Sequence, residues 1–292
     1  MSKNILVIQN PNAGRGITEK LRPKLEKLLS QRNFDFQFEL TNAPKHAIEI
    51  AKSNLENGFD SIVAFGGDGT VHEVVNGLAG SNVAFGVIPC GTGNDYARAI
   101  GVKSSMEKAV QCIAECEPEP IDLGKINERY FINAVGIGFD GVATEESAKI
   151  TKVKGPLVYL IAIVKTLKKF KSIELEIEMN GTKKTMDTFL FEISKGPSVG
   201  GGLALNPDAK QDSGEFRICH LAPMSIPALL KDFPKLKNGK IDKAKTVTRF
   251  RAKNLTVKCE IPMPIHIDGE YVEEKELRFE ILPKSFRVHR FA

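Results

Sequence analysis

Short apolar runs alternate with helical patterns over roughly the first 120 residues of the chain. Three of the runs are uninterrupted, as in buried strands, and one alternates apolar and polar residues, as in a half-exposed strand. The runs are Ile5–Ile8, Phe34–Leu40, Ile62–Phe65 and Val83–Ile88. The helical patterns cover about residues 17–31, 45–57 and 71–78. Repeated strand–helix units of this length predict a parallel sheet covered by helices on both faces.

The pattern changes near residue 121, where helical patterns become rare and strand-like segments follow one another. These segments are Phe131–Ile137, Ile173–Met179, Thr188–Ile193, Phe216–Leu221, Thr246–Phe250, Leu255–Cys259 and Leu277–Ile281. Asn180-Gly181, between two of them, is a strong signal for a hairpin turn. Many short strands predict an antiparallel sandwich or barrel. We therefore expect an α/β domain over residues 1–124 and an all-β sandwich domain over residues 125–292. The last strand of the chain can also pair with the sheet of the first domain.

Composition narrows the class of protein. The chain has 292 residues, of which 42% are hydrophobic and 26% charged, as in a folded globular protein. Its net charge of +5 is too mild for a general nucleic-acid binder, so no nucleic-acid partner is expected. The five cysteines form no CxxC pair, and scattered cysteines are most often reduced, buried thiols of a cytosolic protein. No apolar run approaches the roughly 20 residues of a spanning helix, and the first run is too short for a signal peptide, so we expect a cytoplasmic protein.

A glycine-rich turn, Gly66-Gly67-Asp68-Gly69-Thr70, follows the third apolar run and opens a helix. Glycines let a backbone approach phosphate oxygens closely, and the free N–H groups of a helix N-terminus favour a bound anion. Asp68 would repel a phosphate unless a metal ion or a nucleoside hydroxyl offset its charge, so it suggests nearby Mg²⁺. The alternative is a sharp strand-to-helix turn in which Asp68 and Thr70 act only as helix caps.

Two further turns repeat this arrangement. Asn10-Pro11-Asn12-Ala13-Gly14-Arg15-Gly16 follows the first run, and Gly91-Thr92-Gly93-Asn94-Asp95 follows the fourth. Neither has the spacing of a P-loop or of a dinucleotide-binding fingerprint. The carboxyl ends of parallel strands share one edge of the sheet, where ligands of such folds bind. The sequence therefore predicts one phosphate-binding edge built from three turns.

In this order and spacing the turns resemble the bacterial branch of the diacylglycerol kinase catalytic-domain family. The Gly-Gly-Asp-Gly-Thr element alone is shared with NAD kinases and phosphofructokinases, so the combination with the third turn and with a late Asp-Gly-Glu is what is specific. The matching segments are Asn10–Gly14, Gly66–Glu73, Gly91–Arg98, Gly136–Asp140, Asn206–Ala209 and Ile267–Glu270.

The resemblance implies an ATP-dependent lipid kinase that phosphorylates a hydroxyl of a membrane lipid such as diacylglycerol, with Mg²⁺ and with a lipid-binding second domain. Asp68, Asp95 and Asp122 match the aspartates that organise Mg²⁺ and water around the phosphates. The implied nucleotide site comprises Asn10, Pro11, Asn12, Ala13, Gly14, Thr41, Gly66, Gly67, Asp68, Gly69, Thr70, Glu73, Thr92, Asp95 and Asp122.

The implied catalytic residues are Asp68, Asp268 and Glu270. The last two match the acidic residues of the family's Asp-Gly-Glu motif, in which the glutamate is usually assigned as the proton acceptor. Without the upstream motifs, Asp268-Gly269-Glu270 would be interpreted as an ordinary Asp-Gly hairpin turn.

At one position the chain departs from the family's pattern. Family members often have Asp-Asp-Gly where this chain has Asp212-Ser213-Gly214, and the second aspartate ligates a structural Mg²⁺. A hydroxyl is a poor replacement for a carboxylate. Either Asp212 substitutes from the adjacent position, or the structural metal is absent.

Residues 149–171 contain seven lysines and no acidic residue. The lysines are Lys149, Lys152, Lys154, Lys165, Lys168, Lys169 and Lys171. Pro156 can open a helix whose apolar face would be formed by Leu157, Leu160, Ile161, Val164 and Leu167. An apolar face flanked by lysines suits the surface of an anionic membrane, and the alternative is a core-packed helix with a solvated basic side. We expect peripheral membrane contact, and an exposed strand of the second domain could support a homodimer.

Two other function classes remain open. A kinase of NAD or of a sugar phosphate would share the Gly66–Thr70 turn, but the third turn, the Asp-Gly-Glu motif and the basic helix disfavour it. A nucleotide-binding regulatory protein without turnover is disfavoured because the acidic positions of an active enzyme are occupied, apart from Ser213.

Overall fold

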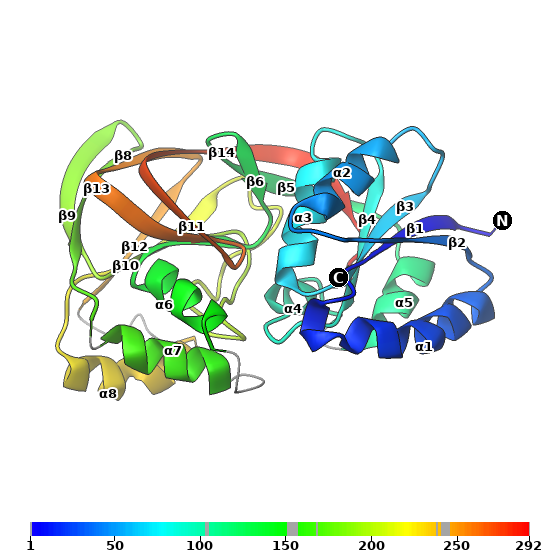
Figure 1. The fold of residues 1–292 in the computed structure, drawn as a ribbon. Coiled ribbons are helices and arrows are strands. Elements are labelled where there is room, and N and C mark those ends of the chain that lie inside the picture. The colour runs from blue at the N-terminus through cyan, green and yellow to red at the C-terminus, as the bar shows by residue number, and fades with distance from the viewer. Residues whose placement is uncertain are drawn as a thin grey trace. The chain divides into compact units, whose positions relative to one another are not determined.

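The computed structural model describes residues 2–102, 105–150, 157–167, 169–237, 239–240 and 246–291, and it divides the chain into two units (Figure 1). The first unit comprises Met1–Leu123 and Pro283–Ala292, and the second comprises Gly124–Leu282. The chain passes from one unit to the other along β5 (Glu119–Ile126) and returns along β14 (Glu270–Val288).

The apolar runs of the first unit form the parallel sheet that their pattern predicts. The strands are β1 (Asn4–Gln9), β2 (Asp35–Leu40), β3 (Ser61–Gly66) and β4 (Ala84–Pro89), in the order β2-β1-β3-β4, and the end of β14 pairs with β4. The uninterrupted runs of β3 and β4 are buried throughout, and the alternating β2 is the half-exposed edge strand. The predicted parallel order is confirmed.

Helices cover both faces of this sheet (Figure 1). They are α1 (Ile17–Gln31), α2 (His46–Ser53), α3 (Asp68–Leu78), α4 (Asp95–Ala99) and α5 (Met106–Glu115), with a short 3₁₀ turn at Ala13–Arg15. The predicted start of α3 at Val71 is wrong. Gly67 is extended and leads directly into the helix, so the first turn of α3 already contains Asp68 and Val71 N donates to Gly67 O over 3.0 Å.

The segment after β14 completes the first unit. His289 donates from Nδ1 to the carbonyl of Cys116 over 2.8 Å, and its Nε2 accepts from the Ser61 hydroxyl over 2.8 Å. Arg290 forms an ion pair with Glu119 at 2.6 Å. The last described residues are therefore bound to β3 and to the start of β5.

The second unit is built from antiparallel pairs, as predicted. Its strands are β6 (Arg129–Phe131), β7 (Ala134–Gly138), β8 (Ile173–Met179), β9 (Thr182–Thr188), β10 (Leu190–Ser194), β11 (Phe216–Leu221), β12 (Val247–Ala252) and β13 (Asn254–Ile267), together with most of β14. The main order is β12-β11-β10-β7-β13-β14, and the β8–β9 hairpin extends from β13. Asn180 and Gly181 both have positive φ, 51° and 72°, which confirms the two-residue hairpin between β8 and β9.

The predicted strand Phe131–Ile137 is wrong as a single element. It is broken at Ile132-Asn133 into β6 and β7. The break is stabilised by the carboxylate of Asp268, which accepts backbone hydrogen bonds from Ile132, Asn133 and Ala134. A local apolar run cannot indicate a partner that lies 136 residues away in sequence.

In the described part of the second unit the helices are α6 (Phe139–Ala148), α7 (Leu157–Leu167) and α8 (Ile226–Lys237). In Figure 1 they lie together, and an apolar cluster including Phe139, Ile163 and Leu229 contains side chains from all three. Of the predicted apolar face of α7, Val164 is 48% exposed, whereas the buried residues among the described side chains of the helix are Ala162, Ile163 and Thr166, which lie outside that face. Because most residues of α7 are apolar, the sequence pattern does not single out the side that packs against α6. No helix in the described part of the chain is both long and apolar enough to cross a bilayer.

The five cysteines are free thiols. Cys90, Cys112 and Cys219 are buried, and Cys116 and Cys259 are partly buried. Burial raises the pKa of Cys90 to about 11 and is the main cause that raises the pKa of Cys112 to about 12. The structure thus agrees with unreactive, reduced thiols rather than a redox centre.

Candidate active site

The three glycine-containing turns meet at the carboxyl edge of the first unit's sheet. They follow β1, β3 and β4, which are parallel neighbours. Asn10 Nδ2 donates to Thr70 Oγ1 over 3.1 Å and joins the first turn to the second. Cys90 N donates to Gly66 O over 2.7 Å and joins the third turn to the second. The single edge predicted from the sequence is therefore present.

The glycines allow these turns to pack backbone against backbone. A Cβ atom on Gly91 would lie 2.7 Å from Cα of Gly67, and a Cβ atom on Gly14 would lie 2.4 Å from the carbonyl oxygen of Cys90. Both distances are too short for a side chain. The backbone N–H groups of such turns are the donors that a phosphate chain uses.

Two carboxylates border the same small space within the third turn. The backbone N of Asn94 donates to Asp68 Oδ2 over 2.7 Å. A Cβ atom on Gly93 would lie 2.6 Å from Asp68 Oδ2 and 3.4 Å from Asp95 Oδ2. Asp95 also forms an ion pair with Arg98 at 2.6 Å. Carboxylate oxygens are the ligands that Mg²⁺ binds, usually together with several waters, so Asp68 and Asp95 are of the right chemical type to hold this ion.

Among the other expected residues of the first turn, Asn12 and Gly14 are exposed and Pro11 and Ala13 are partly exposed. Asn12 is exposed and donates from its backbone N to Asn10 Oδ1 over 3.0 Å, and Ala13 N donates to Asn10 O over 3.1 Å. Asn10 therefore organises the turn, and Pro11 and Gly14 complete it. Thr92, in the third turn, is exposed.

Glu73 and Asp122 make structural hydrogen bonds. The Glu73 carboxylate accepts from the backbone N of Lys45 over 2.9 Å and of Ala47 over 3.1 Å, which caps α2. Asp122 is buried and accepts from the backbone N of Lys284 over 3.0 Å, which anchors the returning segment. Thr41 is buried after β2, and its N donates to Gln9 O over 2.9 Å. These bonds give Glu73 and Asp122 structural roles that the sequence pattern did not indicate.

Asp268 and Glu270 belong to the second unit, at the turn between β13 and β14. Asp268 and Gly269 have φ of 48° and 94°, and Ile267 pairs with Glu270, so the turn is a two-residue hairpin. Asp268 is buried, and its two carboxylate oxygens accept three backbone N–H groups at 2.8–3.0 Å. Glu270 is partly exposed at the first position of β14. The segment is therefore both a hairpin turn and an acidic motif. The carboxylate of Asp268 binds the backbone of residues 132–134, whereas Glu270 is partly exposed.

A buried ion network in the second unit was missed by the sequence reasoning. His266 Nε2 lies 2.7 Å from Asp140 Oδ2 and 3.6 Å from Glu192 Oε2. A Cβ atom on Gly136 would lie 2.5 Å from His266 Nε2 and 2.7 Å from Glu192 Oε2, so only glycine fits between them. Asp140 belongs to Gly136–Asp140, one of the segments that resemble the family. Nothing in the sequence around Glu192 or His266 indicated that these two side chains lie beside Asp140.

Burial and mutual charge shift the titration of this network. Burial raises the pKa of Glu192 to about 7, against the opposing effect of His266. Burial alone would lower the pKa of His266, but the carboxylates of Asp140 and Glu192 outweigh it and raise that pKa well above its usual value. The three ligand atoms lie within 4.8 Å of one another, a spacing that a metal ion could use, and the His266 and Asp140 atoms are at ion-pair distance, 2.7 Å.

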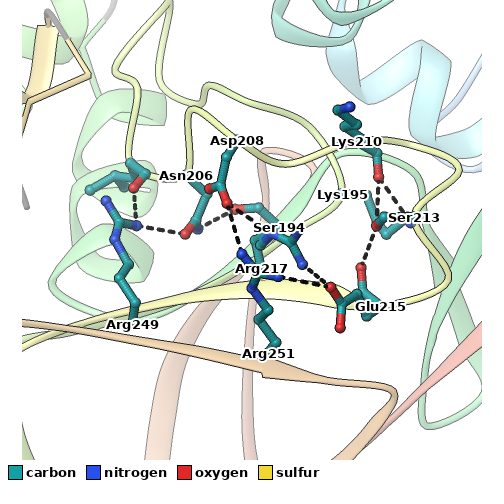
Figure 2. Close-up of polar contacts among 11 residues, drawn as sticks. Ser194, Lys195, Asn206, Asp208, Lys210, Ser213, Glu215, Arg217, Arg249 and Arg251 are labelled. Atoms are coloured by element: carbon teal, nitrogen blue, oxygen red, sulfur yellow. Dashed lines mark hydrogen bonds and ion pairs between the residues drawn. The ribbon is translucent and has the colours of Figure 1, made fainter.

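The residues expected to hold a structural Mg²⁺ do not fit that ion. Asp212 is exposed, and the Ser213 hydroxyl is engaged with the carbonyl oxygens of Lys210 and Glu215 (Figure 2). The expectation of a metal at Asp212 and Ser213 is not supported by this geometry.

Comparison with known proteins supplies independent information on the family. The model of the diacylglycerol kinase catalytic domain matches residues 4–126, and that of the YegS C-terminal NAD kinase beta sandwich-like domain matches residues 133–290. The chain is 30% identical to a diacylglycerol kinase of Staphylococcus carnosus, over 99% of this chain and 95% of the relative. It is 31% identical to a diacylglycerol kinase of Bacillus subtilis, over 92% of this chain and 90% of the relative.

Solved structures show the same architecture. A crystal structure of a putative diacylglycerol kinase from Bacillus anthracis superposes with a TM-score of 0.81 at 26% identity. The alignment covers 99% of this chain and 97% of that chain. The α/β first unit and the β-sandwich second unit are thus those of diacylglycerol kinase-like structures.

Proposed function

Because the chain belongs to the diacylglycerol kinase catalytic-domain family, a family of kinases, we propose that it transfers the γ-phosphoryl group of ATP to a hydroxyl of a membrane lipid such as diacylglycerol. The observation that carries this proposal is the interlocked set of three turns with Asp68 and Asp95 around the Gly93 gap. Phosphoryl transfer depends mainly on positioning and on neutralising charge, and this edge of the sheet offers both backbone donors and cation ligands.

We assign separate roles to the acidic residues. Asp68 and Asp95 would hold Mg²⁺, which offsets the charge of the phosphates when bound. Glu270 would accept the proton of the lipid hydroxyl as its oxygen bonds to the γ-phosphorus and the bond to the bridging oxygen of ADP breaks. Asp268 is a positioning residue, since its carboxylate oxygens already accept three backbone N–H groups. A buried carboxylate that already accepts three backbone N–H groups is a poor starting point for a general base.

We also propose that α7 contacts an anionic bilayer. Val164 and Lys165 are exposed on α7, and Lys169 and Lys171 are exposed just after it. Ala162 and Ile163 are buried, so the helix is anchored on one side and exposes an apolar residue beside cations on the other. Lys152, Lys154, Pro156 and Lys168 lie outside the described residues, as do the side chains of Leu157 and Leu160.

The proposed function is tested with labelled ATP and purified acceptors. Diacylglycerol, phosphatidylglycerol, a sphingoid base, a polyprenol and NAD⁺ are incubated separately with the protein and Mg²⁺. We expect label in a lipid product and none in NADP⁺. Label in NADP⁺ alone would favour the NAD kinase alternative, and ATP binding without any labelled acceptor would favour a regulatory protein.

A further inference from the structure

The turn that contains Ser213 is closed by groups of the protein itself (Figure 2). The Ser213 hydroxyl lies 3.1 Å from the carbonyl oxygen of Lys210 and 2.9 Å from that of Glu215. Mg²⁺ in proteins binds carbonyl and carboxylate oxygens at about 2.0–2.1 Å in octahedral geometry. The single O–H of Ser213 donates to one of these carbonyls at a time, so it engages part of the acceptor set that such an ion would use, and it supplies no negative charge to hold an ion.

A buried ammonium group reaches the same turn. Lys195 follows β10 directly and is fully buried, and its Nζ donates to the carbonyl oxygen of Lys210 over 3.3 Å (Figure 2). Its backbone N donates to Asn133 O over 2.7 Å, which fixes the base of the side chain. Burying a charged amine is costly unless it is paired and hydrogen-bonded, and the Lys210 carbonyl is one acceptor for this amine. Lys195 therefore brings a covalently attached cation to the carbonyl of Lys210.

The carboxylates beside the turn are bound by arginines (Figure 2). Arg217 Nε lies 3.0 Å from Asp208 Oδ2, and another nitrogen of the same guanidinium pairs with Glu215. Arg251 lies 3.8 Å from Asp208 and 3.6 Å from Glu215. Asp212, the remaining acidic residue, is exposed. Guanidinium groups thus already neutralise the carboxylates that would otherwise favour a divalent cation.

We infer that this turn is a metal-free version of the structural metal site, in which the Lys195 ammonium and the Ser213 hydroxyl bind the carbonyl oxygens that a metal ion would bind. The cation is part of the chain, so the fold of the second unit does not depend on the concentration of a divalent metal. Mg²⁺ is then needed only with the nucleotide. The inference concerns stability and holds or fails independently of the lipid kinase proposal.

The first test uses the wild-type chain without nucleotide. Thermal unfolding is followed by circular dichroism in EDTA, in Mg²⁺ and in Ca²⁺. We expect the same Tm in all three solutions. A Tm that falls in EDTA and recovers when Mg²⁺ is restored would overturn the inference.

The second test removes the internal cation. Lys195→Met keeps most of the length of the side chain and removes the ammonium group, which leaves Lys210 O without this donor. Lys210→Met is the matched control, because it deletes a lysine whose side chain is exposed and retains the carbonyl. We expect Lys195→Met to lower Tm by about 3 °C or more and Lys210→Met to leave it unchanged. Equal effects of the two substitutions would contradict the role assigned to Lys195.

The third test rebuilds a metal site. The double variant Lys195→Met/Ser213→Asp has a carboxylate in the turn and no internal cation, and we expect its Tm to rise with added Mg²⁺ or Ca²⁺ and to fall with EDTA. Ser213→Asp alone keeps the ammonium and should gain no metal dependence. If Lys195→Met does not fold, wild type and Ser213→Asp still decide the question, because a Tm that depends on the metal in either of these two proteins would refute the inference.

Discussion

Replacing Asp268 by asparagine separates the two roles that an acidic residue can have in the Asp268-Gly269-Glu270 hairpin. Asp268 Oδ1 accepts from the backbone N of Asn133 and Ala134, and Oδ2 accepts from Ile132 at 2.8 Å. An asparagine oxygen can retain at most the pair at Oδ1, and its NH₂ group then faces the N–H of Ile132. One charge-assisted hydrogen bond, worth about 1.5–3 kcal/mol, is lost, and a buried donor costing about 1–3 kcal/mol is left unsatisfied.

The expected loss for Asp268→Asn is therefore roughly 3–5 kcal/mol of unfolding free energy, which lowers Tm by about 10 °C in a unit of this size. The matched control is Glu270→Gln, two residues away and partly exposed at the start of β14. It should leave Tm unchanged and reduce kcat by about 10²–10⁴-fold with ATP binding retained. Urea or thermal unfolding, read beside lipid phosphorylation, gives both quantities. A stable Asp268→Asn variant, or a fully active Glu270→Gln variant, would refute the division of roles.

Further predictions concern the nucleotide edge, the buried ions and the membrane. Asp68→Ala should abolish lipid phosphorylation and leave the fold intact by circular dichroism, since its proposed role is to organise Mg²⁺ and ATP; a fully active folded variant would exclude it. Gly93→Ala should reduce Mg²⁺-dependent turnover at least tenfold, because its Cβ would lie 2.6 Å from Asp68 Oδ2; unchanged titration of activity with Mg²⁺ would contradict this. The unfolding free energy of wild type should fall as pH rises from about 4.5 through 7, because folded Glu192 (pKa about 7) and His266 retain protons that the unfolded chain releases. The difference in unfolding free energy between pH 5 and pH 8, measured by urea titration, should be up to about 3 kcal/mol smaller in Glu192→Gln than in wild type. The same difference in both proteins would refute the raised pKa of Glu192. Replacing three exposed lysines with glutamine should weaken sedimentation with anionic vesicles, by about 1 kcal/mol for each lysine, and leave binding to neutral vesicles unchanged; equal binding of both proteins to anionic vesicles would place the membrane surface elsewhere. These lysines are Lys165, Lys169 and Lys171.

Local pattern was enough to predict the parallel sheet, the antiparallel second unit and the shared edge of the three turns. Uninterrupted apolar runs mark buried strands, and the Asn180-Gly181 turn fixes the β8–β9 hairpin even though Thr182–Thr188 is polar and was not recognised as a strand. The sequence predicted the turn at Asp268, but it did not predict that the Asp268 side chain separates β6 from β7. The carboxylate interrupts an apolar run 136 residues earlier in the chain, and periodicity carries no information about such a contact.

The buried ions show the same limit. Glu192 lies in an apolar strand and His266 in another, and a single sequence gives no reason to pair them. Only the register of β7 with β10 and with β13 places both opposite Gly136. Similarly, Ser213 was recognised as a departure from a metal site, whereas the compensating Lys195 became visible only in the folded chain.

The contacts of His289 and Arg290 have a consequence for biosynthesis. A ribosome makes the first unit's sheet and helices early, but Ser61 and Glu119 gain these partners only when residues 289 and 290 have been translated. Until then the nascent first unit lacks its fifth strand and the second unit must be made as an insertion within it. Folding on the ribosome is thus expected to finish in the reverse of the usual N-terminal-first order, with the first unit completed last.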